Sequence, residues 1–131
     1  MPSRILIVDD EPHMLRLTEL SLKKGGFDLL IGRNGHQAID LARKNRPDLI
    51  VMDVLMPEMD GLTALRALKQ APDTADIPVI MLTARGHVMT RQEAEDSGAA
   101  LFLTKPFSPT NLLREAERLI AARLALAPPQ E

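Results

Sequence analysis

Five polar residues follow short apolar runs in this sequence, and their side-chain types suit phosphate chemistry. They are Asp9 and Asp10 after Ile5–Val8, Asp53 after Leu49–Met52, Thr83 after Val79–Leu82, and Lys105 just beyond Leu101–Leu103. Carboxylates supply oxygen ligands for a hard cation, an ammonium supplies a point charge, and a hydroxyl supplies a hydrogen-bond donor. Brought together, these groups could neutralise a phosphoryl group while one carboxylate receives it.

The apolar run that leads to Asp53 indicates a fully buried strand. Residues Leu49–Met52 show no alternation of polar and apolar positions. A strand with one solvated face alternates, whereas a strand covered on both faces reads as a continuous apolar run. We therefore expect Asp53 to end a strand of a parallel sheet that is flanked by helices.

Five such runs alternate with segments of helical periodicity. The expected strands are Ile5–Val8, Phe27–Ile31, Leu49–Asp53, Val79–Leu82 and Leu101–Leu103. The expected helices begin at Pro12, near Ala38, near Leu62, at about His87 and at Pro109. This alternation predicts an α/β fold of flavodoxin-like type, with a doubly wound, five-stranded parallel sheet in the order 2-1-3-4-5 and helices on both faces. The fourth helix, His87–Ser97, has few apolar residues, so we expect it to be the most loosely attached.

The predicted fold brings the polar residues to one edge, because the carboxyl ends of parallel strands meet there. Asp9, Asp10 and Asp53 would lie at the switch point between the first and third strands. At about 5 Å and an effective dielectric constant near 20, each pair of carboxylates repels by roughly 3 kcal/mol, so a cation must offset the repulsion. Mg²⁺ keeps several waters beside one or two carboxylates, and it suits a partly open edge better than a full Ca²⁺ cage.

The composition excludes several other function classes. With 131 residues the chain is the size of one domain, and we expect a core over about 4–123 with a helix extension and tail over 124–131. A net charge of −2, scattered cationic residues and only three aromatic residues are unlike a nucleic-acid-binding surface. The chain has no cysteine and no long apolar run, which predicts a cytoplasmic protein without a membrane segment.

Four short motifs occur in the order Ile7–Glu11, Met52–Gly61, Leu82–Ala84 and Thr104–Phe107. Together they resemble the receiver domain of bacterial two-component response regulators. The resemblance covers nearly the whole chain, and the motifs stand in the family's order and at its spacing. Any one motif would be weak evidence, but the set is highly specific.

The resemblance implies a phosphoacceptor with a metal site beside it. Asp53 would accept a phosphoryl group from a histidine kinase or a histidine phosphotransfer protein. Asp10 would bind Mg²⁺ directly and Asp9 largely through water, while Asp53 and the backbone carbonyl of Leu55 would complete the protein ligands. Such a domain is a signalling switch that catalyses only its own phosphotransfer and slow dephosphorylation, and it is not an enzyme acting on an external substrate.

The resemblance also implies how phosphorylation is read out. Lys105 would hold the phosphoryl group, and the Lys105–Pro106 peptide bond is expected to be cis. Thr83 and Ala84 would bind the phosphoryl oxygens, and Phe102 would move inward behind Thr83. The resulting population shift would act on the surface of the fourth helix, fifth strand and fifth helix, toward a downstream protein or an output domain outside this chain.

Two of the departures from the family's common pattern bear on the switch and on the lifetime of the phosphoryl group. Phe102, expected as a buried strand aromatic, has no hydroxyl, so the switch would work by packing alone. Leu55 and Arg85, two positions beyond Asp53 and Thr83, offer no carboxylate or amide to orient an attacking water. We therefore expect the phosphorylated state to decay slowly.

An alternative from another class is a phosphatase of haloacid-dehalogenase type, which also uses a strand-end aspartate with Mg²⁺. Such an enzyme requires a second acid two residues later, where this sequence has Leu55. Taken singly, Asp9, Asp10 and Asp53 could also be helix N-caps or loop residues.

The chain could be a free-standing receiver or part of a larger regulator. Leu124 and Leu126 are spare apolar positions of the last helix that could serve a dimer or a following linker. A phosphorylation-dependent homodimer is a further candidate partner.

Overall fold

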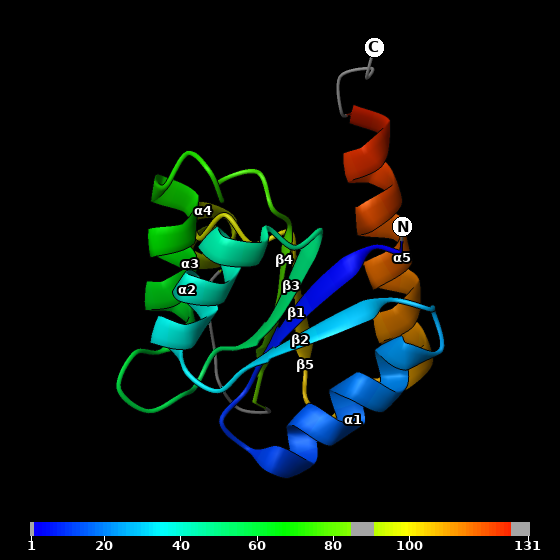
Figure 1. Ribbon diagram of the computed structural model, residues 1–131. Helices are drawn as coiled ribbons and strands as arrows, with labels where there is room; N and C mark the ends of the chain where they lie inside the picture. The colour runs from blue at the N-terminus through cyan, green and yellow to red at the C-terminus, as the bar shows by residue number, and fades with distance from the viewer. Residues whose placement is uncertain (1, 85–90, 127–131) are drawn as a thin grey trace.

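A five-stranded parallel sheet forms the centre of the molecule, as Figure 1 shows for the computed structural model, which describes residues 2–84 and 91–126. The strands are β1 (Arg4–Val8), β2 (Asp28–Gly32), β3 (Leu49–Asp53), β4 (Val79–Thr83) and β5 (Leu101–Thr104). They pair in the order β2-β1-β3-β4-β5, and every pair is parallel. The predicted flavodoxin-like strand order is therefore confirmed.

Helices cover both faces of the sheet. The helices are α1 (Pro12–Lys23), α2 (Gly35–Asn45), α3 (Gly61–Gln70), α4 (Arg91–Asp96) and α5 (Pro109–Leu126). In Figure 1, α2 and α3 lie on one side of the sheet, while α1 and α5 lie on the other. Successive strand residues point to opposite faces, so each strand contributes to two cores. Ile50 and Met52 belong to the α2–α3 side, and Val51 belongs to the α1–α5 side.

Short polar side chains begin three of the helices. Asn34 accepts a hydrogen bond from the backbone N–H of Gln37 at 2.8 Å, and Asp60 accepts one from Thr63 at 2.8 Å. Ser108 accepts one from Asn111 at 3.2 Å. Each bond satisfies a backbone donor that the first helical turn leaves unpaired, which fixes where α2, α3 and α5 start.

Several observed boundaries differ from the predicted ones by one or a few residues, among them those of β2 and α4. β2 begins at Asp28 and ends at Gly32, one residue later than expected at each end. α4 spans Arg91–Asp96, which is shorter than the predicted His87–Ser97, and 85–90 lie outside the described residues. The described side chains of α4, namely Gln92, Glu93, Glu95 and Asp96, are exposed because this segment has little apolar surface to bury. Within 2–84 and 91–126, none of the helices has the length and apolar character needed to cross a membrane.

Candidate functional site

Three carboxylates meet where β1 and β3 end. One carboxylate oxygen from each of Asp9, Asp10 and Asp53 lies within 4.8 Å of the other two. Asp9 is 1% exposed and Asp53 is 7% exposed, whereas Asp10 is open to solvent. Successive residues at a strand end face opposite ways, so Asp9 turns into the protein and Asp10 turns toward water. The predicted convergence on the switch point is thus present in the structure.

Lys105 crosses from the end of β5 to join two of these carboxylates. Its Nζ lies 3.1 Å from Oδ2 of Asp9 and 3.2 Å from Oδ1 of Asp53. Its backbone N–H donates to the carbonyl oxygen of Thr83 at 2.7 Å, which fixes the residue beside the end of β4. The Lys105–Pro106 peptide bond is cis. One cation therefore faces two buried carboxylates, which leaves the cluster with excess negative charge.

The protonation equilibria of the site reflect this imbalance. Burial raises the pKa of Asp53 above its ordinary value, and the nearby Asp9 carboxylate raises it further. Lys105 and the backbone N–H of Leu55 lower it, but they do not cancel the increase. Burial lowers the pKa of Lys105, yet the Asp9 and Asp53 carboxylates outweigh that effect, and the net pKa lies above the usual value. A further cation beside Asp53 would favour its ionised form.

The predicted switch residues lie beside this cluster. Thr83 is 7% exposed, and its hydroxyl donates to the carbonyl oxygen of Leu103 at 3.4 Å. Thr83 and Met81 alternate onto the same face of β4, and Met81 is opposite Phe102 on β5. Phe102 is only partly buried, contrary to the prediction, because β5 is an edge strand. Ala84 is also partly buried, whereas Arg85 lies outside the described residues.

The loop between β3 and α3 folds back tightly over Asp53. The backbone N–H of Gly61 donates to the carbonyl oxygen of Val54 at 2.8 Å, and a Cβ atom at Gly61 would overlap the backbone oxygen of Asp53. Only glycine permits this approach. In the sequence, Gly61 is marked only as the last residue of the Met52–Gly61 motif. The glycine directly after Asp60, the N-cap residue of α3, was the sequence signal that could have indicated this close approach. The Leu55 side chain in this loop is 52% exposed and lies beside the site without a polar group.

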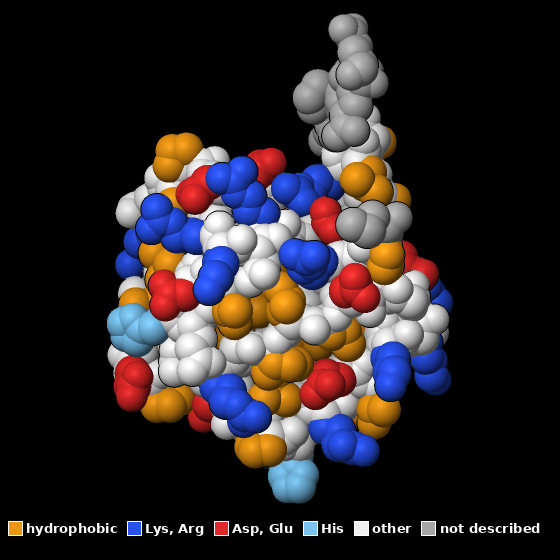
Figure 2. Space-filling view, viewed as in Figure 1, with side chains coloured by type: hydrophobic (Ala, Val, Ile, Leu, Met, Phe, Trp, Pro, Cys, Tyr) orange, Lys and Arg blue, Asp and Glu red, His pale blue; other side chains and the backbone are white. Residues whose placement is uncertain are grey.

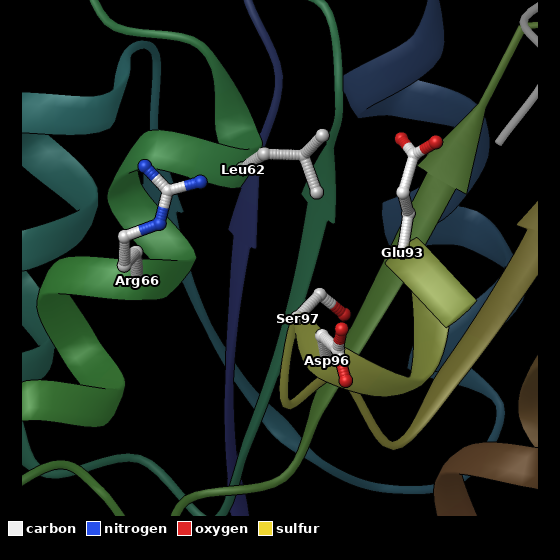
Figure 3. A pocket seen from close by; sticks show the side chains of 5 residues that line it. All are labelled: Leu62, Arg66, Glu93, Asp96 and Ser97. Carbon is white, nitrogen blue, oxygen red and sulfur yellow. The ribbon is translucent and has the colours of Figure 1, made fainter. Parts of the chain in front are cut away.

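A cleft of about 330 Å³ separates α3 from α4. Leu62 and Arg66 line it from α3, and Glu93, Asp96 and Ser97 line it from α4 and the residue after it, as Figure 3 shows. Arg66 lines the cleft from one side, and the carboxylates of Glu93 and Asp96 line it from the other. The cleft lies on the face that carries Phe102, so α4 is incompletely packed against α3 near the predicted switch.

Comparison with known proteins identifies the family. Residues 5–117 match the family model described as the response regulator receiver domain. The chain belongs to this family. Among solved structures, a response regulator from Chloroflexus aurantiacus superposes on this receiver domain with a TM-score of 0.86 at 34% identity, covering 92% of this chain and 99% of that one. The family assignment gives no support to the haloacid-dehalogenase alternative.

Curated relatives extend beyond a receiver domain. The transcriptional regulator RpaA of Synechocystis is 39% identical over 117 residues, which cover 89% of this chain and 48% of that protein. The chain therefore spans about half the length of the curated relatives it matches. A receiver domain of a Pseudomonas aeruginosa sensor histidine kinase, with a TM-score of 0.84 and 30% identity over 92% of this chain and 99% of that one, holds a magnesium ion in its active-site cleft. Receiver domains are signalling switches, and the oxygen-only donor set found in this chain fits the same ion.

Proposed function

We propose that this receiver domain is switched by phosphorylation of Asp53. The observation that carries the proposal is the position of the Asp53 carboxylate, which shares a cluster with Asp9 and Asp10 and lies 3.2 Å from Lys105. Asp10 would bind Mg²⁺ directly and Asp9 largely through water, with Asp53 and the Leu55 carbonyl as the remaining protein ligands. When bound, Mg²⁺ supplies positive charge for the phosphoryl oxygens.

For the transfer of the phosphoryl group, this chain needs to supply only a nucleophile and a positive charge that holds a phosphoryl oxygen. The Asp53 carboxylate forms the new O–P bond as the N–P bond of a phosphohistidine breaks, and the histidine nitrogen leaves with the electron pair. Lys105 already points at Asp53 and would hold one phosphoryl oxygen. The donor would be a histidine kinase or a histidine phosphotransfer protein, acting on a cytoplasmic receiver.

We infer that the signal is read on the surface of α4, β5 and α5. Thr83 and Ala84 would bind phosphoryl oxygens, and Phe102, which shares the face of Thr83, would move inward as the hydroxyl moves. The cleft beside Arg66 gives α4 room to shift on α3. A downstream protein, an output domain or a second phosphorylated copy would bind the altered surface.

The direct test is incubation with acetyl phosphate and Mg²⁺ followed by intact-mass measurement. We expect the wild type to gain one phosphoryl group and Asp53→Asn to gain none. Asp60→Asn is the matched control, because it keeps an N-cap side chain on α3 and should label like the wild type. An unlabelled wild type, or equal labelling of Asp53→Asn, would contradict the proposal.

We further propose that the phosphorylated state is long-lived. The exposed Leu55 side chain beside Asp53 has no carboxylate or amide to orient a water for attack. Leu55→Glu should therefore shorten the half-life by about a hundredfold, the lower end of general-base effects. The measurement is loss of the phosphorylated mass over time in Mg²⁺ buffer. A wild-type half-life of seconds would show that Leu55 does not protect the acyl phosphate.

A further inference from the structure

An apolar patch covers the β2 edge of the sheet. Figure 2 shows hydrophobic side chains gathered across the middle of this face, with Lys, Arg, Asp and Glu side chains around them. Leu29, Leu30 and Ile31 are only partly buried, and no charged residue or proline stands between Asp28 and Arg33. Edge strands usually carry a charge, a proline or a bulge that prevents pairing with another strand. β2 has none of these within its apolar run.

No other strand of the described residues pairs with the outer side of β2. Asp28 donates its N–H to Ser3 at 2.9 Å, and Gly32 accepts from the N–H of Asp9 at 3.2 Å, so these two residues direct their polar groups toward the β1 side. Backbone direction alternates along a strand, and the N–H and C=O groups of Leu29 and Ile31 therefore point away from β1. The backbone N–H of Arg33 donates to the Gln37 side chain at 2.8 Å, which ends the open stretch.

The geometry points to antiparallel pairing of β2 with the same strand of a second copy of this chain, centred on Leu30. The outward residues Leu29 and Ile31 are equidistant from Leu30. A two-fold axis at Leu30 therefore places each Leu29 opposite Ile31 of the partner, and the two pairs exchange four backbone hydrogen bonds. The two sheets would join into one across the dimer.

Charge also favours the antiparallel direction. The strand has Asp28 at its start and Arg33 just beyond its end. Antiparallel pairing brings the acidic end of each strand to the basic end of the other, whereas parallel pairing would bring like charges together. Five-residue strands alone bury less area than a standard interface, so the association is weak and concentration-dependent.

Disulfide trapping tests the register, because the natural chain has no cysteine. In this register, Leu30 of one chain would lie opposite Leu30 of the second copy as a non-hydrogen-bonded pair. Their Cα atoms would be about 4.5 Å apart, which is within the roughly 4.4–6.8 Å range of disulfides. Leu29→Cys should not cross-link, because its Cα would lie roughly 8 Å from its counterpart. Leu103→Cys on β5 is the control for the opposite edge, since Leu103 is also a partly buried leucine.

Mild oxidation of the unphosphorylated chain should give about tenfold more covalent dimer for Leu30→Cys than for either control. Sedimentation of the wild type should show a reversible dimer that Leu30→Lys abolishes, with thermal unfolding used to verify that each variant folds. The dimer should persist in Asp53→Asn, so this test is independent of the phosphoacceptor assignment. The proposal would be overturned by equal cross-linking at positions 29, 30 and 103. It would also be overturned if the backbone amides of β2 were protected from hydrogen exchange only after a phosphotransfer partner is added.

Discussion

The ionised Asp53 carboxylate lowers the stability of the folded protein. Burial and the neighbouring Asp9 raise its pKa, and Lys105 offsets only part of that increase. A raised pKa means that the folded chain binds the Asp53 proton more tightly than the unfolded chain does. Ionised Asp53 therefore destabilises the folded protein at neutral pH. This destabilisation disappears as the pH falls through the pKa that Asp53 has in the folded state.

We predict that Asp53→Asn stabilises the metal-free protein at pH 7. Asparagine removes the buried charge but keeps the shape of the side chain, and the gain should be about 1 kcal/mol, or roughly 3–5 °C in Tm. Thermal unfolding in EDTA measures it, and the difference from the wild type should shrink in acid. Asp40→Asn on the exposed face of α2 should leave Tm unchanged. A less stable Asp53→Asn would contradict this account.

At the scale of elements, one arginine ties the end of α5 to two loops. The Arg123 guanidinium lies 3.2 Å from Asp48, which precedes β3, and 3.5 Å from Asp76, which precedes β4. Asp48 also accepts the backbone N–H of Arg4 at 2.8 Å. Figure 1 shows α5 extending beyond the sheet at this end, so the contact holds the last part of the helix against the body.

We predict that Arg123→Ala loosens the end of α5. Its ion pairs are partly exposed, so the loss should be about 1 kcal/mol, the upper end for such pairs. Urea unfolding gives the stability, and amide exchange over 119–126 should quicken. Arg118→Ala is the matched control, since among the described residues Arg118 pairs with Glu115 of the same helix and is more exposed than Arg123. Similar losses in both variants would mean that the Arg123 ion pairs do not anchor the end of α5.

At the scale of the molecule, the carboxylate cluster couples stability to a cation. We predict that Mg²⁺ raises the free energy of unfolding by about 2.7 kcal/mol at a hundredfold excess over its Kd, because binding to the folded state relieves repulsion among Asp9, Asp10 and Asp53. Thermal unfolding across a Mg²⁺ titration measures the effect. Asp10→Asn should weaken it. An equal rise with NaCl of the same ionic strength would indicate general screening rather than a site.

Most of the fold follows from local patterns in the sequence. Continuous apolar runs such as Leu49–Met52 identify buried parallel strands, and the strand–helix alternation leaves few topologies, so the strand order and the meeting of Asp9, Asp53 and Lys105 at one edge could be predicted. The prediction was less accurate for α4, where periodicity was weak, and for Phe102, whose exposure depends on its place in an edge strand.

Sequence alone identified which groups meet at the carboxyl edge, because parallel topology brings strand ends together whatever the packing. Tertiary structure decided how they meet. The way each residue turns at the end of β1 buries Asp9 and exposes Asp10, and the path of the chain after β5 directs Lys105 to Asp9 as well as to Asp53. The close approach of Gly61 to Asp53 and the exposure of the apolar β2 edge also depend on distances between segments far apart in the chain, which no local pattern encodes.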